Sequence, residues 1–350
     1  MKTFEWVALS EESHIGQARR IARRLGAELA FTDRQLAEVE ILINELGTNA
    51  LKFGRGTGQI FLSVMDEKIE KGGLEVIYTD KGAGIADPSL AVEDGFTTSD
   101  SLGSGLGAIS RMSDEFHIYS LVESQTRPLS LYGRTTHGTV IVARKHVAPE
   151  GKRPPRGPRL WGVLTRPPAG ETHNGDAYFI RQDEDRILLA VIDGLGHGEG
   201  ASDAARAAIE SIGGNAGKPV ESIMRAAHEA LRPTRGAVIG LSAIDCSTRL
   251  IEYVGIGNTD FRVLGGGSTL KFISLNGTVG SRMDRLKVFK GELPKSCMLT
   301  MSTDGISERW DLDQYPGLQG LHPQLACSVI MRDYSRPKDD ATILCGRLSF

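Results

Sequence analysis

A run of prolines and basic residues, VAPEGKRPPRGPR at residues 147–159, limits the folds open to this chain more than any other segment. Proline fixes φ and has no amide hydrogen to donate, so four prolines this close together exclude a helix interior or a central strand. The segment has no hydrophobic periodicity and is typical of a stiff, solvated linker. We therefore expect two domains, at residues 1–146 and 160–350, each long enough to bury its own core.

Composition narrows the classes of partner and the compartment. The 350 residues are 40% hydrophobic and 24% charged with a formal net charge of -3, which is ordinary for a globular protein and does not favour nucleic acid as a partner. No apolar run approaches the roughly 18 residues of a membrane span, and the first residues lack the order of a signal peptide. The four cysteines are scattered without a CxxC pair, so we expect reduced, mostly buried thiols in a cytoplasmic protein.

In the first half, the hydrophobic pattern predicts two helices followed by strands. Apolar residues recur at helical spacing in two segments, four segments alternate as strands do, and a glycine turn leads into a short helix. This order is typical of an α+β domain. The helices are expected at 14–30 and 34–53, the strands at 58–66, 73–85, 116–124 and 138–145, and the glycine turn with its helix at 103–116.

The second half contains many strand-like segments and two helical ones. An alanine-rich segment and a second amphipathic segment follow one another and predict consecutive helices. Many strands with a few long helices indicate a β-sandwich core with flanking helices. The strands are expected at 177–182, 186–193, 236–245, 250–258, 297–305 and 339–348, and the helices at 200–214 and 221–232.

Glu45 and Asn49 lie four residues apart in the helix expected at 34–53. At about 100° per residue, Glu45 lies on a flank of the helix and Asn49 at the margin of its apolar face. When this helix is taken alone, a solvated polar edge explains both residues. An amide at an apolar margin nevertheless needs hydrogen-bond partners. The two residues are therefore also candidates for contact with a ligand.

Two later segments supply groups that suit a nucleotide. Asp80 ends a strand and is followed by Gly82 and Gly84, where a missing side chain lets the backbone approach a planar ligand. The segment GFTTSDSLGSGLGA places backbone N–H groups at a helix start, which suits phosphates. A dinucleotide-binding Rossmann interpretation fails, because this cluster does not follow a strand in an N-terminal βαβ unit. The candidate residues of the segment are Thr97, Thr98, Gly103, Gly105 and Gly107.

The order of NELGTNALKFG, DKGAGI and GSGLGAI resembles the N, G1 and G2 boxes of the GHKL ATPase superfamily. The nearest resemblance is to the RsbT-type serine kinases (HATPase_c) of bacterial partner-switching systems, over about residues 5–145. It implies a Bergerat α/β sandwich that binds ATP with Mg²⁺. By this resemblance Asn49 helps to hold Mg²⁺, Glu45 takes the proton from the substrate hydroxyl, and Asp80 hydrogen-bonds the adenine amino group. Residues 97–107 would cover the phosphates, and the acceptor would be a separate protein.

Acidic residues mark four strand ends or turns in the second half. Each aspartate alone is typical of a turn. Together they indicate a site for a hard cation, because carboxylates suit Mg²⁺ or Mn²⁺ and are costly to bury together without one. Two such ions can activate water for attack on a phosphoryl group. The residues are Asp176, Asp193 with Gly194, Asp304, and the pair Asp339 and Asp340.

The order GD, DGxGHG, TDGxxE and DDxT resembles the SpoIIE/PP2C family of metal-dependent Ser/Thr phosphatases, nearest to its small RsbX-like members. The resemblance covers about residues 160–348 and implies an αββα sandwich with two Mn²⁺ or Mg²⁺ ions. It implies that Asp193 bridges both ions as the catalytic residue and that Gly194 binds through its carbonyl. Asp176, Asp304 and Asp339 would complete the metal shells, with Asp340 the less expected member of its pair.

Two departures from the PP2C pattern stay open. Asn174 replaces the first glycine of the usual GGD. The phosphate-binding arginine of larger relatives has no clear counterpart, with Arg159 and Arg166 as candidates. His197, in the DGLGHG segment, is more consistent with a turn residue or an orienting group than with a metal ligand.

The two resemblances together predict a bifunctional enzyme of a partner-switching pathway. The first half would phosphorylate a serine or threonine on a STAS-domain protein (RsbS/RsbR-like), and the second half would remove that phosphate, controlling a sigma-factor or stressosome-type pathway. Two alternatives remain. The ATP-binding half could sequester a partner without turnover, or it could regulate an active phosphatase half. Neither nucleic acid nor a membrane is expected as a partner.

Overall fold

The structure of the protein is a computed structural model that describes residues 4–65, 67, 71–92, 105–123, 136–147, 159–283 and 285–350. The chain divides into two compact units: an N-terminal unit, Lys2–Pro155 with Asp311–Leu321, and a C-terminal unit, Arg156–Trp310 and His322–Phe350 with Met1. The domain borders at residues 146 and 160 stay a prediction, because residues 148–158 lie outside the described ranges.

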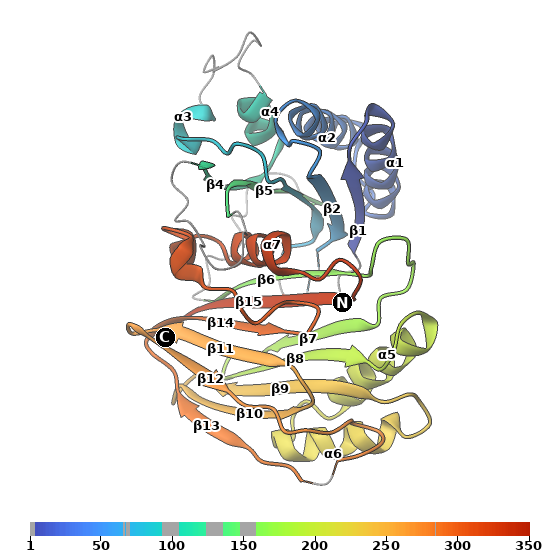
Figure 1. Ribbon diagram of the computed structural model, residues 1–350, viewed down its shortest axis with the longest axis vertical. Coiled ribbons are helices and arrows are strands. Elements are labelled where there is room, and N and C mark those ends of the chain that lie inside the picture. The colour runs from blue at the N-terminus through green and yellow to red at the C-terminus, as the bar shows by residue number, and fades with distance from the viewer. Residues whose placement is uncertain are drawn as a thin grey trace. The chain divides into compact units, whose positions relative to one another are not determined.

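The N-terminal unit is an antiparallel sheet covered on one face by helices (Figure 1). Its strands lie in the order β1-β2-β3-β5-β4. Apolar residues from α1, α2, α4 and the facing strands form one buried cluster, including Leu42, Leu46 and Ile60. The elements are β1 (Phe4–Leu9), α1 (Glu12–Glu28), α2 (Asp33–Phe53), β2 (Gly58–Val64), β3 (Gly73–Thr79), α3 (Pro88–Ala91), α4 (Gly105–Met112), β4 (Glu115–Leu121) and β5 (Gly138–His146).

Helix α2 confirms the sequence pattern closely. It begins after Thr32, whose side chain accepts a hydrogen bond from the Gln35 backbone N–H while the Gln35 side chain accepts one from the Thr32 N–H. Such a capping box satisfies two backbone donors that a helix start otherwise leaves unpaired. Gln35 also donates to the His146 carbonyl at 2.9 Å, which ties the start of α2 to the end of β5. The helix that carries Glu45 and Asn49 is thus fixed to the sheet.

The C-terminal unit is an αββα sandwich, as the sequence predicts. One sheet, β13-β10-β9-β8-β7, is covered by α5 and α6, and the second, β12-β11-β14-β15-β6, by α7 (Figure 1). The elements are β6 (Arg159–Arg166), β7 (Asp176–Gln182), β8 (Arg186–Gly194), α5 (Glu199–Gly214), α6 (Val220–Leu231), β9 (Ala237–Asp245), β10 (Leu250–Ile256), β11 (Asp260–Gly265), β12 (Ser268–Phe272), β13 (Phe289–Glu292), β14 (Ser296–Ser302), η2 (Leu312–Gln314), η3 (Leu318–Gly320), α7 (Pro323–Tyr334) and β15 (Ala341–Ser349), of which η2 and η3 belong to the stretch grouped with the N-terminal unit.

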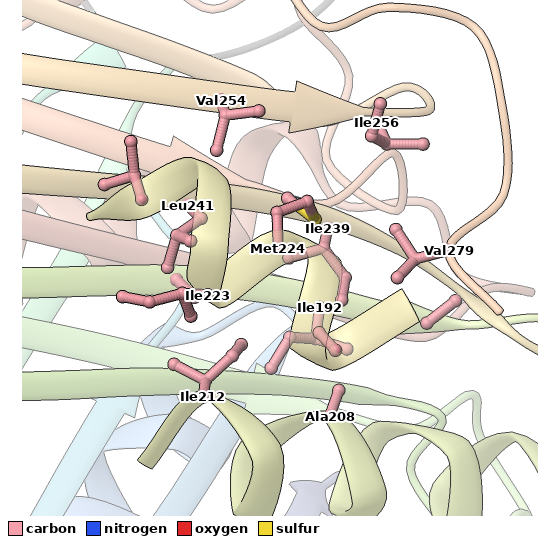
Figure 2. Packing of buried hydrophobic residues seen from close by; sticks show 14 of the residues in the cluster. Ile192, Ala208, Ile212, Ile223, Met224, Ile239, Leu241, Val254, Ile256 and Val279 are labelled. Atoms are coloured by element: carbon pink, nitrogen blue, oxygen red, sulfur yellow. The ribbon is translucent and has the colours of Figure 1, made fainter. Parts of the chain in front are cut away.

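The layer between α5, α6 and their sheet is a dense apolar core. Figure 2 shows Ala208 and Ile212 of α5 and Ile223 and Met224 of α6 directed at strand residues such as Ile239. Because these side chains are fully buried, truncating one of the larger ones to alanine would cost about 2–5 kcal/mol. This core holds rigid the sheet whose strand ends carry two of the candidate aspartates. All four cysteines are free thiols and three of them are buried, in line with the expected mostly buried thiols.

A buried ion network stabilises the sheet of the N-terminal unit and makes its stability depend on pH. Arg144, almost fully buried, pairs with Glu75 at 2.7 Å and with Glu115 at 3.2 Å, and His146 contacts Glu115 at 3.0 Å. The hydrogen bond from His146, aided by the Arg144 charge, outweighs burial and lowers the pKa of Glu115 to about 2.

We expect acid to destabilise this unit through Glu115. Because its pKa is depressed in the folded state, its contribution is complete above the ordinary carboxyl range and is lost as pH falls towards 2, by about 2–3 kcal/mol. Denaturant unfolding between pH 6 and pH 2.5 should show this loss in the wild type and in the exposed control Glu12→Gln. A Glu115→Gln variant that keeps the full wild-type slope would contradict this assignment.

Candidate functional sites

Glu45 and Asn49 project from α2 towards the start of α4. A Cβ atom added to Gly105, the first residue of α4, would lie 3.0 Å from Glu45 Oε2 and 3.6 Å from Asn49 Nδ2. Across the described ranges, neither side chain has a hydrogen-bond partner, and both are only partly buried. The protein therefore leaves a carboxylate and an amide beside a glycine helix start, with their polar atoms available to a ligand.

Asp80 is held at the end of β3 by backbone donors. Its Oδ1 accepts hydrogen bonds from the N–H groups of Gly82 at 2.7 Å and Thr139 at 3.2 Å, and the side chain is buried. Burial, followed by the neighbouring charge of Asp80, raises the pKa of Tyr78 strongly. The carboxylate is thus fixed in place at a buried turn.

The glycines after Asp80 are required by close contacts between chain segments. A Cβ on Gly82 would overlap the Phe53 carbonyl oxygen, and one on Gly84, whose φ is +78°, would overlap the Leu121 carbonyl oxygen. Both glycines, expected to let the backbone approach a ligand, also allow two backbone segments of the protein to touch. His137, which the sequence did not indicate, supports the same turn through Nδ1, 2.6 Å from the Gly82 carbonyl oxygen.

The remaining candidates of the nucleotide site divide between two groups. Gly105 and Gly107 lie in the first turn of α4, and Gly107 is buried. Thr97, Thr98 and Gly103 lie outside the described residues. A separate surface groove of about 480 Å³ runs between α1 and α2, but neither Glu45 nor Asn49 lines it.

The topology of the C-terminal unit brings its candidate aspartates together. Asp176 begins β7 and is paired in register with Asp193 at the end of β8. Asp304 follows β14, and Asp339 and Asp340 precede β15, the neighbour of β14. Both sheets thus present their acidic strand ends at one end of the sandwich.

These carboxylates act electrostatically on one another. Burial and the charges of Asp304, Asp339 and Asp340 raise the pKa of Asp193 to about 7. Burial and the charge of Asp193 raise the pKa of Asp176 well above its usual range, and burial with the Asp339 charge raises that of Asp340 to about 6. Several negative charges forced together in this way are what a divalent cation neutralises.

The donor set fits a divalent metal site. Oδ1 of Asp340 is buried without a hydrogen-bond partner, as expected of an oxygen reserved for a cation. Within the described ranges, however, no three His, Cys, Asp or Glu side chains are grouped closely enough to hold one ion together. Mg²⁺ usually keeps several waters and binds one or two carboxylates. An arrangement of pairs is therefore compatible with the proposed ions.

Neutral side chains hold Asp176 and its turn in place by hydrogen bonds. The Thr303 hydroxyl donates to Asp176 Oδ2 at 2.6 Å. Asn174 accepts from the Asp176 N–H at 3.0 Å and donates to the Thr165 hydroxyl at 2.7 Å. The asparagine that departs from the usual GGD pattern thus fixes the turn that carries Asp176. Outer contacts of this kind set the orientation of metal ligands.

Three glycines allow the backbone segments of the centre to touch. A Cβ on Gly194 would overlap the Ala201 carbonyl oxygen, and one on Gly305 would overlap the Asp340 carbonyl oxygen. A Cβ on Gly175 would lie 2.9 Å from Asp340 Oδ2. Asp340 was the less expected member of its pair, but its Oδ1 is buried without a hydrogen-bond partner and both carboxylates act on Asp193. We therefore include both residues in the candidate site.

The candidates for binding or orienting a phosphate differ in their distance from the acidic centre. Arg159 lies at the far end of β6 and donates to the carbonyls of Asp183 and Glu184. Arg166 lies at the near end, where the charges of Asp339 and Asp340 act on it. Its guanidinium donates to the carbonyls of Pro167 and Arg336 and to the Ser335 hydroxyl.

The third candidate, His197, is exposed. Its Nδ1 lies 3.8 Å from Glu171 Oε1, and in its protonated form it would lower the pKa of Asp340. Of the three, Arg166 and His197 lie beside the acidic centre, and Arg159 does not.

Comparison with known proteins follows the division into two halves. Residues 8–127 match the family described as histidine kinase-like ATPase domain, and residues 183–349 match the stage II sporulation protein E (SpoIIE) family. The chain is 36% identical over 120 residues to the serine/threonine-protein kinase RsbT of Bacillus subtilis (strain 168), covering 34% of this chain and 89% of RsbT.

Relatives of the second half are equally well covered. The chain is 26% identical over 181 residues to the phosphoserine phosphatase RsbX of Bacillus subtilis (strain 168), covering 51% of this chain and 90% of RsbX. The chain is also similar to a solved structure, with a TM-score of 0.52 and 29% identity. That structure comes from work on the bacterial stressosome as a modular system adapted to control secondary messenger signalling. That similarity covers 54% of this chain and 99% of the other. No helix among the described residues is long and apolar enough to cross a membrane.

Proposed function

The chain belongs to the histidine kinase-like ATPase family through an RsbT-like serine kinase domain and to the SpoIIE family through an RsbX-like PP2C-type serine phosphatase domain, and we propose that the two form one bifunctional switch enzyme. The first half phosphorylates a serine or threonine of a STAS-domain partner of the RsbS/RsbR type, and the second half removes the phosphate. The partner belongs to a stress-responsive sigma-factor or stressosome-type pathway. The observation that carries the phosphatase proposal is the acidic centre, where carboxylates from four segments repel one another at one end of the sandwich.

In the kinase half, the side chains of α2 provide the chemistry. Asn49 would bind the Mg²⁺ of Mg-ATP, and Asp80, held by two backbone donors, would accept from the adenine amino group. Glu45 lies beside Asn49 with no competing hydrogen bond in the described ranges, so it is available to accept the proton of the attacking hydroxyl. Gly105 and Gly107 would direct N–H groups at the phosphates, with Thr97, Thr98 and Gly103 completing the loop.

In the phosphatase half, each aspartate has a proposed role in binding the metal ions. Asp193 would contact both metal ions, Gly194 would contribute its carbonyl, and Asp176, Asp304, Asp339 and Asp340 would complete the shells. When bound, two Mn²⁺ or Mg²⁺ ions supply an activated water and neutralise the phosphoryl charge. Thr303 and Asn174 keep Asp176 in one orientation throughout.

Because the two domains are parts of one chain, there is one kinase domain for each phosphatase domain. A partner released from one half remains near the other at a high effective concentration, so the phosphorylated fraction depends on the relative rates of the two sites. The level of ATP then acts on one rate only. A switch of this kind consumes ATP at rest and responds quickly when either rate changes.

The proposal predicts that the chain adds a phosphate to its partner and removes it again. With ATP and Mg²⁺, the Asp193→Asn chain, in which the phosphatase half is expected to be inactive, should add one phosphoryl group to a STAS-domain protein of the RsbS/RsbR type, measured by intact mass. Addition of the wild-type chain with Mn²⁺ after depletion of ATP should return the unmodified mass. Tight binding of the partner without any gain in mass would contradict the kinase and favour a sequestering ATP-binding module. A phosphorylated partner that stays modified in Mn²⁺ would contradict the phosphatase.

A further inference from the structure

Asn258 makes a hydrogen bond to one of the acidic candidates that no sequence motif indicates. Its Nδ2 donates to Asp304 Oδ2 at 2.7 Å. Within the described residues this is the one hydrogen bond that reaches the Asp304 carboxylate. Asn258 lies in the turn between β10 and β11, whereas Asp304 follows β14, so the contact joins two segments 46 positions apart in the sequence.

The turn that carries Asn258 is fixed on both sides. Gly257 has φ +101°, and its N–H donates to the Leu275 carbonyl at 2.7 Å. On the other side, the Thr259 hydroxyl contacts the Ser274 hydroxyl at 3.0 Å and the buried Tyr253 hydroxyl at 3.1 Å. Because the neighbours on both sides are held, the Asn258 amide reaches Asp304 from a fixed backbone, whereas a mobile loop would lose entropy on doing so.

The hydrogen-bond donors around the acidic centre share one property. Asp176 receives a hydrogen bond from Thr303 and Asp304 receives one from Asn258, and both donors are neutral. A neutral donor orients a carboxylate and leaves its negative charge for a cation, whereas an arginine or lysine at hydrogen-bond distance would compensate that charge. The amide takes one acceptor position of Oδ2, while Oδ1 has no hydrogen-bond partner among the described residues.

We propose that Asn258 is a positioning residue that orients Asp304 for one metal ion and, being neutral, limits the number of cations that the centre holds. This inference rests on the proposed metal-dependent phosphatase. Loss of an outer partner of a metal ligand typically lowers metal affinity by about 10- to 100-fold. A carboxylate in place of the amide would face Asp304 at hydrogen-bond distance, where two like charges are stable only with a proton or a further cation between them.

Mn²⁺ binding tests the inference without any assay of turnover. Calorimetric titration of the full chain, with electron paramagnetic resonance of free Mn²⁺ as a second readout, should give about 10- to 100-fold weaker binding at one site in Asn258→Ala. Asn258→Asp should bind one more Mn²⁺ per chain at saturation. Asn215→Ala is the control, since this amide donates to the Ser211 carbonyl at the opposite end of α5, about 24 Å along that helix from its start.

The outcomes separate this inference from the proposed function. Wild-type affinity and stoichiometry in both Asn258 variants would overturn the role of Asn258 alone and leave the metal site intact. A wild-type chain that binds no Mn²⁺ would overturn the metal-dependent phosphatase and this inference with it. Thermal unfolding in chelator checks that the variants are folded, and Asn258→Asp, which keeps the size of the side chain, gives a reading even if Asn258→Ala is unstable.

Discussion

Asp193→Asn is expected to abolish the hydrolysis of phosphoserine on the partner, by more than about 100-fold. Loss of a residue that only hydrogen-bonds a metal ligand lowers metal affinity or activity by up to about 100-fold. Asp193 would contact both ions directly, so its loss should have a larger effect. An amide of the same size retains the shape of the side chain but removes the charge that holds the cations. The measurement is the Mn²⁺ dependence of phosphate release. Asp183→Asn is the matched control, because this exposed aspartate lies in the turn at the far end of β7 and β8.

The same substitution should have the opposite effect on stability when metal is removed. Burial and three neighbouring charges raise the pKa of Asp193 to about 7. A carboxyl with a raised folded-state pKa contributes stability below the ordinary carboxyl range and loses it as pH rises through about 7.

At pH 8 in chelator, Asp193→Asn should therefore be more stable than the wild type by up to a few kcal/mol, since each pKa unit corresponds to about 1.4 kcal/mol. Denaturant unfolding measures the difference. Unchanged phosphatase activity in chelator would contradict the two-metal mechanism.

Glu45→Gln is expected to lower phosphoryl transfer from ATP to the partner by about 10²- to 10⁴-fold, the usual contribution of a general base. ATP binding should change little, because Asn49, Asp80 and the glycines are untouched. Transfer is followed by intact mass and nucleotide affinity by calorimetry, with the exposed Glu28→Gln at the end of α1 as control. Full transfer by Glu45→Gln would remove Glu45 from the mechanism. A variant that loses ATP binding as well would indicate a structural role.

Much of the fold could be predicted where one face of an element is buried and the other is solvated. Helix α2 shows this pattern together with its capping box, and its predicted bounds differ from the observed ones by one residue. Helix α7 was not predicted, because every residue of it except Arg332 is buried and no polar face marks its period. Strands β1 and β6 were also missed, since nothing in their short sequences distinguishes them before their partners are known.

The candidate sites show the same limit at the level of single residues. Motif order indicated the acidic strand ends, and the family matches confirm the two resemblances. The motif ranked Asp339 above Asp340, and only the pairing of β15 with β14 and β6 brings the segment that carries both carboxylates to the acidic centre. Asn258, Thr303 and His137 were missed because each acts through a hydrogen bond to a residue distant in sequence. The identity of the metal ligands stays a prediction.

The close backbone contacts at Gly175, Gly194 and Gly305 have a consequence for how this centre can evolve. At each position a single added carbon meets a neighbouring strand, helix or carboxylate. A side chain at any of these three positions would displace the segments that carry several candidate ligands at once, whereas exchange of a single carboxylate or of its neutral partner leaves the backbone as it is. Metal preference is therefore more open to change through these side chains than through the backbone that carries them.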